Sequence, residues 1–244
     1  MYIDDYFFFL IAIIVCMIFS LIASAKVRSA FSKYNSIPNR SGLSGSETVK
    51  QLMNANNIND IQIGNINGRL SDHYHPKKAI VNLSDDTYNN SSIAAVAVAA
   101  HEMGHVMQDK TGYLFFRIRT AIVPIVNFGS ALAMPLVLVG VIIDYLSIAA
   151  NPELGFYIAM FGVILYGGSL LFAIITLPVE FNASRRAKEM LLSEKILSAD
   201  EIRGANKVLS AAALTYIASF LTSLVYFLRF LVRVLTIFGK RNND

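Results

Sequence analysis

The chain has 244 residues, of which 55% are hydrophobic and only 16% are charged. Soluble domains carry about 25% charged residues, so this composition points to a membrane protein and excludes a disordered chain. The single cysteine, Cys16, excludes an intramolecular disulfide and a metal site built from cysteines. The formal net charge is a modest +4, and no nucleic-acid partner is predicted.

Four long apolar stretches are candidates for crossing a lipid bilayer, which requires about 20 apolar residues. The first three are predicted to be transmembrane helices over residues 7–25, 121–143 and 154–179. The fourth, residues 208–238, is uncharged only as far as Leu228. Because Arg229 and Arg233 follow, this segment is expected either to span the membrane or to lie along its surface.

The charges that flank these stretches predict how the chain is oriented. Asp4 and Asp5 precede the first span and basic residues follow it, which is typical of an uncleaved anchor rather than of a cleaved signal peptide. Basic residues also outnumber acidic ones in residues 26–120 and 180–207, whereas the link 144–153 is acidic. By the positive-inside rule we expect 26–120 and 180–207 in the cytoplasm, in a multi-pass protein of the cell membrane.

Residues 26–120 are long enough for one small α+β domain, and two of its helices can be predicted. Ser44 and Glu47 have the spacing of a capping box, which predicts the start of an amphipathic helix. A second, alanine-rich helix is predicted over residues 93–109. After the third span, residues 180–207 are predicted to form a further helical segment.

Three short strands are predicted between these two helices. Ile61 and Ile63 alternate with polar neighbours, and Asn67-Gly68 predicts a hairpin turn to a return strand over residues 69–74. Residues 79–83 predict the third strand. Strands joined in this order predict a small meander.

The alanine-rich helix carries the sequence His101-Glu102-Met103-Gly104-His105. Histidines four residues apart project from one face of a helix, where both can bind a single zinc ion. Glu102 is then placed to take a proton from a water molecule that the zinc activates, which is the chemistry of a metallopeptidase. The alternative is that both histidines are surface residues that only pack against the helix or face solvent, and that they bind no metal.

Two histidines leave a zinc ion short of protein ligands, so a third ligand is required. His73 and His75 are the other two histidines of the chain, and Glu180 is a conspicuous carboxylate because it ends the apolar run of the third span. The residues alone leave open whether Glu180 is a ligand, a helix cap or an ion-pair partner of Arg185 or Arg186.

Three blocks of the sequence are distinctive when they are taken together. They read GRLSDHY at residues 68–74, AAHEMGH at residues 99–105 and LPVEFNASRRA at residues 177–187. These blocks resemble the YugP-like family of bacterial membrane proteins, which is classed as neutral zinc metallopeptidases. The likeness extends over nearly the whole chain and includes residues 211–216.

The resemblance implies a metal centre with one Zn²⁺ per chain. His101 and His105 would be ligands of this ion, Glu180 would be the third ligand, and Glu102 would be the general base. Ser184 stands where a wider group of membrane zinc peptidases has an aspartate. A serine hydroxyl can still hydrogen-bond a ligating histidine, but less strongly than a carboxylate does.

Other polar residues near these blocks have alternative roles. His73 is a candidate for stabilising the oxyanion of the tetrahedral intermediate, although a histidine in a strand more often packs or faces solvent. Arg185 and Arg186 are alternatives for that role, or they bind lipid phosphates. No role is assigned to His75.

We therefore expect a mainly α membrane protein with three or four transmembrane helices and a small zincin-like α+β cytoplasmic domain. The expected function is that of a gluzincin-like zinc endopeptidase, which cleaves polypeptides, including segments of membrane proteins, near the cytoplasmic surface of the bilayer. Residues 79–83 are expected to offer a strand edge to the substrate. Intramembrane cleavage is disfavoured because the uncharged run 87–100 is too short to span the bilayer.

Two functions other than proteolysis remain as alternatives. A non-catalytic membrane scaffold or adaptor would use the zinc site only structurally, which requires four protein ligands and no base. A channel or transporter is expected to carry charges inside its spans, and the first three predicted spans have none. No oligomeric state is predicted.

Overall fold

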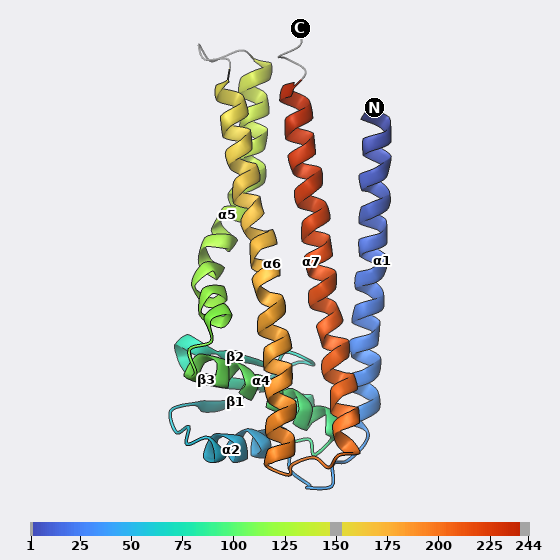
Figure 1. The fold of residues 1–244 in the computed structure, drawn as a ribbon, viewed down its shortest axis with the longest axis vertical. Helices are drawn as coiled ribbons and strands as arrows, with labels where there is room; N and C mark the ends of the chain where they lie inside the picture. Colours follow the sequence, from blue (N-terminus) through green and yellow to red (C-terminus); the bar gives the residue numbers. More distant parts are fainter. Residues whose placement is uncertain (1, 147–152, 240–244) are drawn as a thin grey trace. The chain divides into compact units, whose positions relative to one another are not determined.

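The computed structural model describes residues 2–146 and 153–239, and within them the chain is mainly helical (Figure 1). The long helices are α1 (Tyr2–Asn35), α5 (Leu114–Tyr145), α6 (Leu154–Ser193) and α7 (Glu201–Gly239). The shorter helices are α2 (Gly45–Ala55), α3 (Asp85–Tyr88) and α4 (Ile93–Lys110). The strands are β1 (Gln62–Ile66), β2 (His73–His75) and β3 (Ile80–Ser84), and a 3-10 turn, η1 (Pro76–Lys78), precedes β3. Most of the predicted acidic link 144–153 lies outside the described residues.

The chain folds as two compact units. The helical unit comprises Met1–Ser20, Ile118–Thr176 and Ile217–Asp244. The mixed unit comprises Leu21–Arg117 and Leu177–Tyr216, and it contains the sheet and the shorter helices. Each of the four long helices contributes residues to both units.

The four long helices are each long and apolar enough to cross a membrane. They contain the four predicted apolar segments and extend beyond them. α6 continues without a break through Glu180 to Ser193, so the predicted boundary at residue 180 lies inside one helix (Figure 1). α7 is likewise a single helix across the predicted segment 208–238.

Small residues bring the helices of the helical unit close together. A Cβ atom built on Gly140 of α5 would lie only 2.5 Å from the carbonyl oxygen of Gly155 in α6. Phe238 of α7 packs against Phe156 of α6, with ring centroids 5.5 Å apart. Such close approach is typical of helices in membranes, where packing and hydrogen bonds replace the hydrophobic effect as the source of association.

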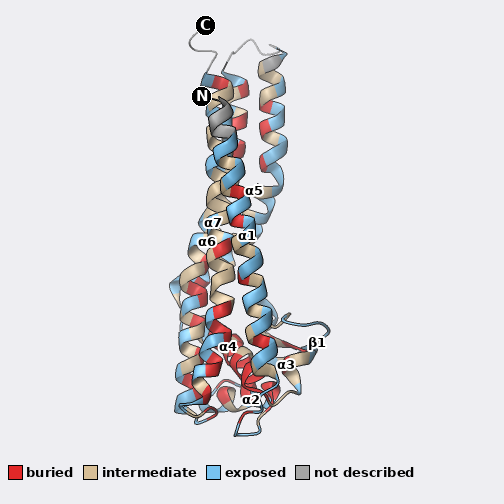
Figure 2. Ribbon diagram, turned by 90° about the vertical axis from the view of Figure 1, so that its right-hand side faces the viewer, coloured by how far each residue is buried: buried red, intermediate tan, exposed pale blue. Residues whose placement is uncertain are grey.

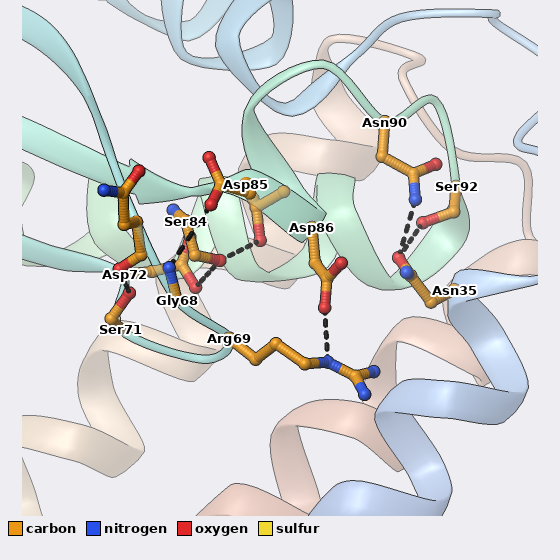
Figure 3. A network of polar contacts seen from close by, with 12 residues as sticks. Asn35, Gly68, Arg69, Ser71, Asp72, Ser84, Asp85, Asp86, Asn90 and Ser92 are labelled. Atoms are coloured by element: carbon orange, nitrogen blue, oxygen red, sulfur yellow. Dashed lines mark hydrogen bonds and ion pairs between the residues drawn. The ribbon is translucent and has the colours of Figure 1, made fainter.

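The sheet of the mixed unit has the strand order β1-β3-β2, in which β1 is parallel and β2 is antiparallel to β3. The predicted hairpin at Asn67-Gly68 and the predicted meander are therefore wrong. The link between β1 and β2 instead crosses the end of β3, where Asp72 accepts hydrogen bonds from the backbone N–H (2.8 Å) and the hydroxyl (2.9 Å) of Ser84 (Figure 3). Because this crossing uses residues 67–72, the predicted return strand 69–74 shortens to residues 73–75.

The central position of β3 also corrects a prediction about substrate binding. Residues 79–83 were expected to offer a free strand edge, but β3 is paired on both sides. The outer edges of the described sheet belong to β1 and β2. A peptide that adds to this sheet must therefore pair with one of those two strands.

α4 lies in the core of the mixed unit, and Figure 2 shows it largely in the colour of buried residues. Its Met103 and Val106 are fully buried, as are Val81 and Leu83 on the inner face of β3. α2 packs on α4 and begins with the predicted capping box between Ser44 and Glu47, which is confirmed. The burial of α4 on several sides holds its few polar side chains in defined positions.

Candidate metal centre

The start of α4, the helix that carries the HExxH sequence, is tied to the end of α1. The Ser92 hydroxyl accepts a hydrogen bond from the backbone N–H of Ala95 (3.1 Å) and donates one to Oδ1 of Asn35 (2.7 Å), as Figure 3 shows for the second contact. Phe31 of α1 packs against Ala94 in the same region. The predicted helix 93–109 is thus confirmed to within one residue, with Ser92 as its N-cap.

Two histidines of α4 and one glutamate of α6 converge on one point. Nε2 of His101 lies 3.3 Å from Oε2 of Glu180, and Nε2 of His105 lies 3.6 Å from the same oxygen. One potential ligand atom from each side chain lies within 4.8 Å of the other two. The fold therefore brings together the three residues that were predicted to be zinc ligands, although His101 and Glu180 are 79 positions apart in the sequence.

The chemistry of this group fits a zinc ion. Two imidazole nitrogens and one carboxylate oxygen form the donor set of catalytic zinc sites, which keep a further position open. Nδ1 of each histidine already contacts another polar side chain, so Nε2 is the nitrogen left to face Glu180. Glu180 is 2% exposed, and a buried carboxylate next to two imidazoles is costly unless a cation or a proton balances its charge. His101, His105 and Glu180 are therefore the residues that would hold the metal.

The close approach of α4 to α6 depends on Gly104, the third residue after the first histidine of the motif. A Cβ atom at this position would lie 2.4 Å from the backbone oxygen of Ala183 in α6. Any side chain larger than a hydrogen would therefore force the two helices apart. The sequence analysis quoted Gly104 as part of the motif but assigned it no role.

Glu102 lies beside the metal-ligand group and is almost completely buried. The backbone N–H of Tyr74 acts to lower the pKa of its carboxyl group, which therefore lies near β2. Burial raises the pKa of Glu102 from 4.5 to about 7, and the nearby His101 opposes this rise. A carboxyl group with such a pKa is able to accept and release a proton near neutral pH.

Both histidines of this group have a polar partner at the Nδ1 atom. The Ser184 hydroxyl lies 3.1 Å from Nδ1 of His101, which is the type of contact that was expected for this serine. Oε1 of Gln108 lies 3.0 Å from Nδ1 of His105. Gln108 was not identified from the sequence, although its position three residues after His105 places it on the same helix face.

His73 lies outside this group. Its Nδ1 lies 2.9 Å from the carbonyl oxygen of Ser71, and its Nε2 lies 3.0 Å from Nδ2 of Asn82. The next residue, Tyr74, donates its hydroxyl hydrogen to Asp109 of α4 at 2.7 Å. Because neighbouring side chains of a strand point to opposite faces, His73 faces away from α4. The structure therefore does not bring His73 to the expected oxyanion position.

The two arginines that follow Glu180 contact protein groups rather than the metal-ligand group. Arg185 forms an exposed ion pair with Glu189 at 2.9 Å. Arg186 donates hydrogen bonds to Oδ1 of Asn182 (2.9 Å) and to the hydroxyl of Thr111 (3.2 Å). Arg186 thus joins α6 to the end of α4.

Comparison with known proteins agrees with this geometry. The family model described as "Putative neutral zinc metallopeptidase" matches residues 9–235. The chain is 41% identical to "Putative membrane protease YugP" of Bacillus subtilis (strain 168) over 210 residues, which are 86% of this chain and 89% of that protein. No solved structure matches the chain. The resemblance drawn from the three sequence blocks is thereby confirmed.

Proposed function

Because the chain belongs to this family of neutral zinc metallopeptidases, we propose that it is a zinc-dependent endopeptidase with Glu102 as its general base. The observation that carries the proposal is the convergence of His101, His105 and Glu180 beside a buried carboxyl group whose pKa is about 7. The positive charge of a bound zinc ion lowers this pKa, so Glu102 is deprotonated and able to act as a base near neutral pH.

A zinc ion held by the three ligands would supply Lewis-acid chemistry, which lowers the pKa of a water molecule and polarises the peptide carbonyl. Glu102 takes a proton from the water as its oxygen bonds to the carbonyl carbon. Glu102 then passes this proton to the amide nitrogen as the C–N bond breaks, so that a carboxylic acid and an amine are formed.

We place the reaction at the cytoplasmic boundary of the membrane. Glu180 directly follows the apolar run 154–179 of α6, and the excess of basic residues in segments 26–120 and 180–207 favours a cytoplasmic side. Polypeptide segments next to the bilayer, including loops of membrane proteins, are the proposed substrates.

An extended peptide is proposed to bind along the outer edge of β2. β2 is an edge strand of the described sheet, and its Tyr74 lies near Glu102, because the backbone N–H of Tyr74 acts to lower the pKa of that carboxyl group. A peptide that adds a strand here would run past the general base. This arrangement supports recognition through the main chain rather than through one particular side chain.

The alternative of a scaffold with a structural zinc site finds less support. Structural zinc sites are closed by four protein ligands. Within residues 2–146 and 153–239, three His, Asp or Glu side chains converge at this point. A structural site also has no use for a buried base beside it.

The first test is the zinc content per chain of the purified protein. We expect about one zinc ion in the wild type and a marked loss in Glu180→Ala, because the third ligand is removed. Glu189→Ala is the matched control, since this exposed glutamate lies on the same helix and pairs with Arg185. A wild type without zinc, or a Glu180→Ala variant that keeps it, would contradict the proposed centre.

The second test separates zinc binding from catalysis. Glu102→Gln is expected to retain zinc and to lose cleavage of casein or of a membrane-protein loop. Cleavage by Glu102→Gln at the wild-type rate would show that Glu102 is not the base.

A further inference from the structure

Gln108 of α4 is fully buried and uses its amide group in three hydrogen bonds. Its Oε1 contacts Nδ1 of His105 at 3.0 Å. Its Nε2 donates to the backbone oxygen of Val179 at 2.7 Å and to Oδ1 of Asn182 at 3.0 Å. One side chain of α4 therefore connects a predicted metal ligand to the turn of α6 that contains Glu180.

The partners of Nε2 determine which way this amide is oriented. The backbone oxygen of Val179 can only accept a hydrogen bond. Oδ1 of Asn182 also accepts one from Nε of Arg186, and a guanidinium group can only donate. Both groups that face Nε2 are thus acceptors, so the NH₂ end of Gln108 must point toward α6 and its oxygen must point toward His105.

This orientation has a consequence for His105. An amide oxygen accepts but does not donate a hydrogen bond, so Nδ1 of His105 must carry the hydrogen. Nε2, which faces Glu180 at 3.6 Å, is then the nitrogen with a free electron pair. The hydroxyl of Ser184 can donate or accept, so its contact with His101 does not impose a tautomer in the same way.

We propose that Gln108 is a positioning residue of the metal centre. It keeps His105 in the tautomer that binds metal through Nε2, and it holds α4 at a fixed distance from the α6 turn that carries Glu180. This inference rests on the proposed zinc centre. Hydrogen-bond partners of ligating histidines orient the ring, and their loss typically lowers metal affinity by about 10-fold to 100-fold.

A measurement on the wild type tests the tautomer directly. The chain contains only four histidines, so labelling all histidine rings with ¹⁵N gives a simple NMR spectrum of the zinc-loaded protein. His105→Asn assigns the signals of His105. We expect a protonated Nδ1 and a metal-bound Nε2 for His105. A metal-bound Nδ1 in His105 would overturn the proposal, whereas a wild type that binds no zinc would contradict the proposed function itself.

Three variants test the positioning role through zinc affinity, measured by competition with a chromophoric chelator. Gln108→Met keeps a similar volume and removes all three hydrogen bonds, so zinc affinity should fall by about 10-fold to 100-fold. Gln108→Glu keeps an acceptor for His105 and should bind zinc more tightly than Gln108→Met. Gln51→Met is the matched control. The amide of Gln51 also donates a hydrogen bond to a backbone oxygen, that of Glu194 directly after α6, at 3.3 Å. Among the described residues, Gln51 has no contact with a proposed metal ligand.

The visible spectrum of the Co²⁺-loaded variants gives a readout that a loss of general stability would not change. Gln108→Met should alter this spectrum, whereas Gln51→Met should match the wild type. Wild-type affinity and spectrum in Gln108→Met, or equal affinities of Gln108→Met and Gln108→Glu, would overturn the proposal. If Gln108→Met does not fold, the ¹⁵N spectrum of the wild type decides the question.

Discussion

Glu102 of α4 has an environment that favours its neutral form, because its carboxyl group is buried near β2. The Coulombic contribution of Glu180 adds to this effect, whereas His101 and the backbone N–H of Tyr74 favour the charged form. The net result is a pKa of about 7. Both the activity and the stability of the protein should therefore depend on this one group.

The pH dependence of proteolysis should show an acidic limb that belongs to Glu102. A general base must be deprotonated, so kcat/KM should rise as the pH increases through its pKa. The positive charge of a bound metal lowers this pKa, so the limb is expected between pH 4.5 and 7. Initial rates at low substrate concentration across this range provide the measurement. A value of kcat/KM that falls steadily from pH 5 to pH 7 would contradict this assignment.

The stability of the metal-free protein should depend on Glu102 in the opposite direction. The pKa of Glu102 in the folded protein is raised above its ordinary value of 4.5, because burial favours the neutral form. Below pH 4.5 the group is neutral in both the folded and the unfolded protein. The folded protein loses stability as the pH rises through about 7, because a buried carboxyl group must then become charged. Glu102→Gln removes this dependence, and at pH 8 it should stabilise the metal-free protein by up to about 3 kcal/mol. Comparing the melting temperatures of both proteins at pH 4 and pH 8 checks this, and an equal difference at both values would argue against it.

Gly104→Ala tests the requirement for a glycine at the contact between α4 and α6. The added methyl group would collide with the backbone of Ala183, so we expect a loss of about 1–3 kcal/mol in stability and at least about 10-fold weaker zinc binding. Gly129→Ala is the control, because a Cβ atom there meets its nearest neighbour at an ordinary 3.5 Å. Wild-type zinc affinity in Gly104→Ala would show that the helix contact tolerates a side chain.

The strands and helices of the mixed unit position the proposed base as well as the proposed ligands. β2 is held against β3 by the crossing link, in which Asp72 binds the end of β3 through Ser84. The backbone N–H of Tyr74, two residues later, acts to lower the pKa of Glu102. The crossing of the sheet is therefore connected to the chemistry of the site and not only to the packing of the core.

Asp72→Ala should loosen this connection. It leaves the buried backbone N–H of Ser84 without its acceptor and removes one of two partners of the Ser84 hydroxyl, which also contacts Thr87 at 3.2 Å. We therefore expect a loss of about 1–3 kcal/mol and a lower kcat/KM. Asp86→Ala, which removes an ion pair with the largely exposed Arg69, should cost less than about 1 kcal/mol. Thermal unfolding and peptidase assays of both variants distinguish them. Equal effects would mean that Asp72 has no special role.

At the scale of the whole molecule, four helices are long and apolar enough to span a bilayer, and two separate segments supply the site. The proposed metal ligands come from α4, between the first two apolar helices, and from α6, after the third apolar run. Two spans separate these segments in the predicted topology. An even number of crossings returns the chain to the same side, which is what a shared site requires.

Labelling with a membrane-impermeant maleimide tests this topology. Cys16 is the sole native thiol, so Cys16→Ala gives a background without cysteine. In it, Lys50→Cys and Lys207→Cys are expected to react only after the cells are opened, and Glu153→Cys is expected to react in intact cells. All three native side chains are exposed. Labelling of Lys50→Cys in intact cells would reverse the proposed orientation.

The sequence by itself determined the features that depend on neighbouring residues. Apolar runs of sufficient length predicted the long helices, the Ser44–Glu47 spacing predicted a helix start, and the HExxH sequence predicted two ligands on one helix face. In each case the residues involved lie within a few helical turns of one another. Local spacing is therefore enough to predict the geometry.

Only the tertiary structure decided which distant residues meet. β3 lies between β1 and β2, although Asn67-Gly68 predicts a hairpin that would pair β1 with β2. The link between β1 and β2 crosses the end of β3 instead, and hydrogen bonds from Ser84 to Asp72 hold it there. The residues left Glu180 as one of several possible ligands, and the fold brought it to His101 across 79 positions. The contact of Gln108 with α6 likewise spans 71 positions. Contacts between residues so far apart in the sequence depend on how whole helices pack against one another. The residue pattern within one segment does not predict that packing.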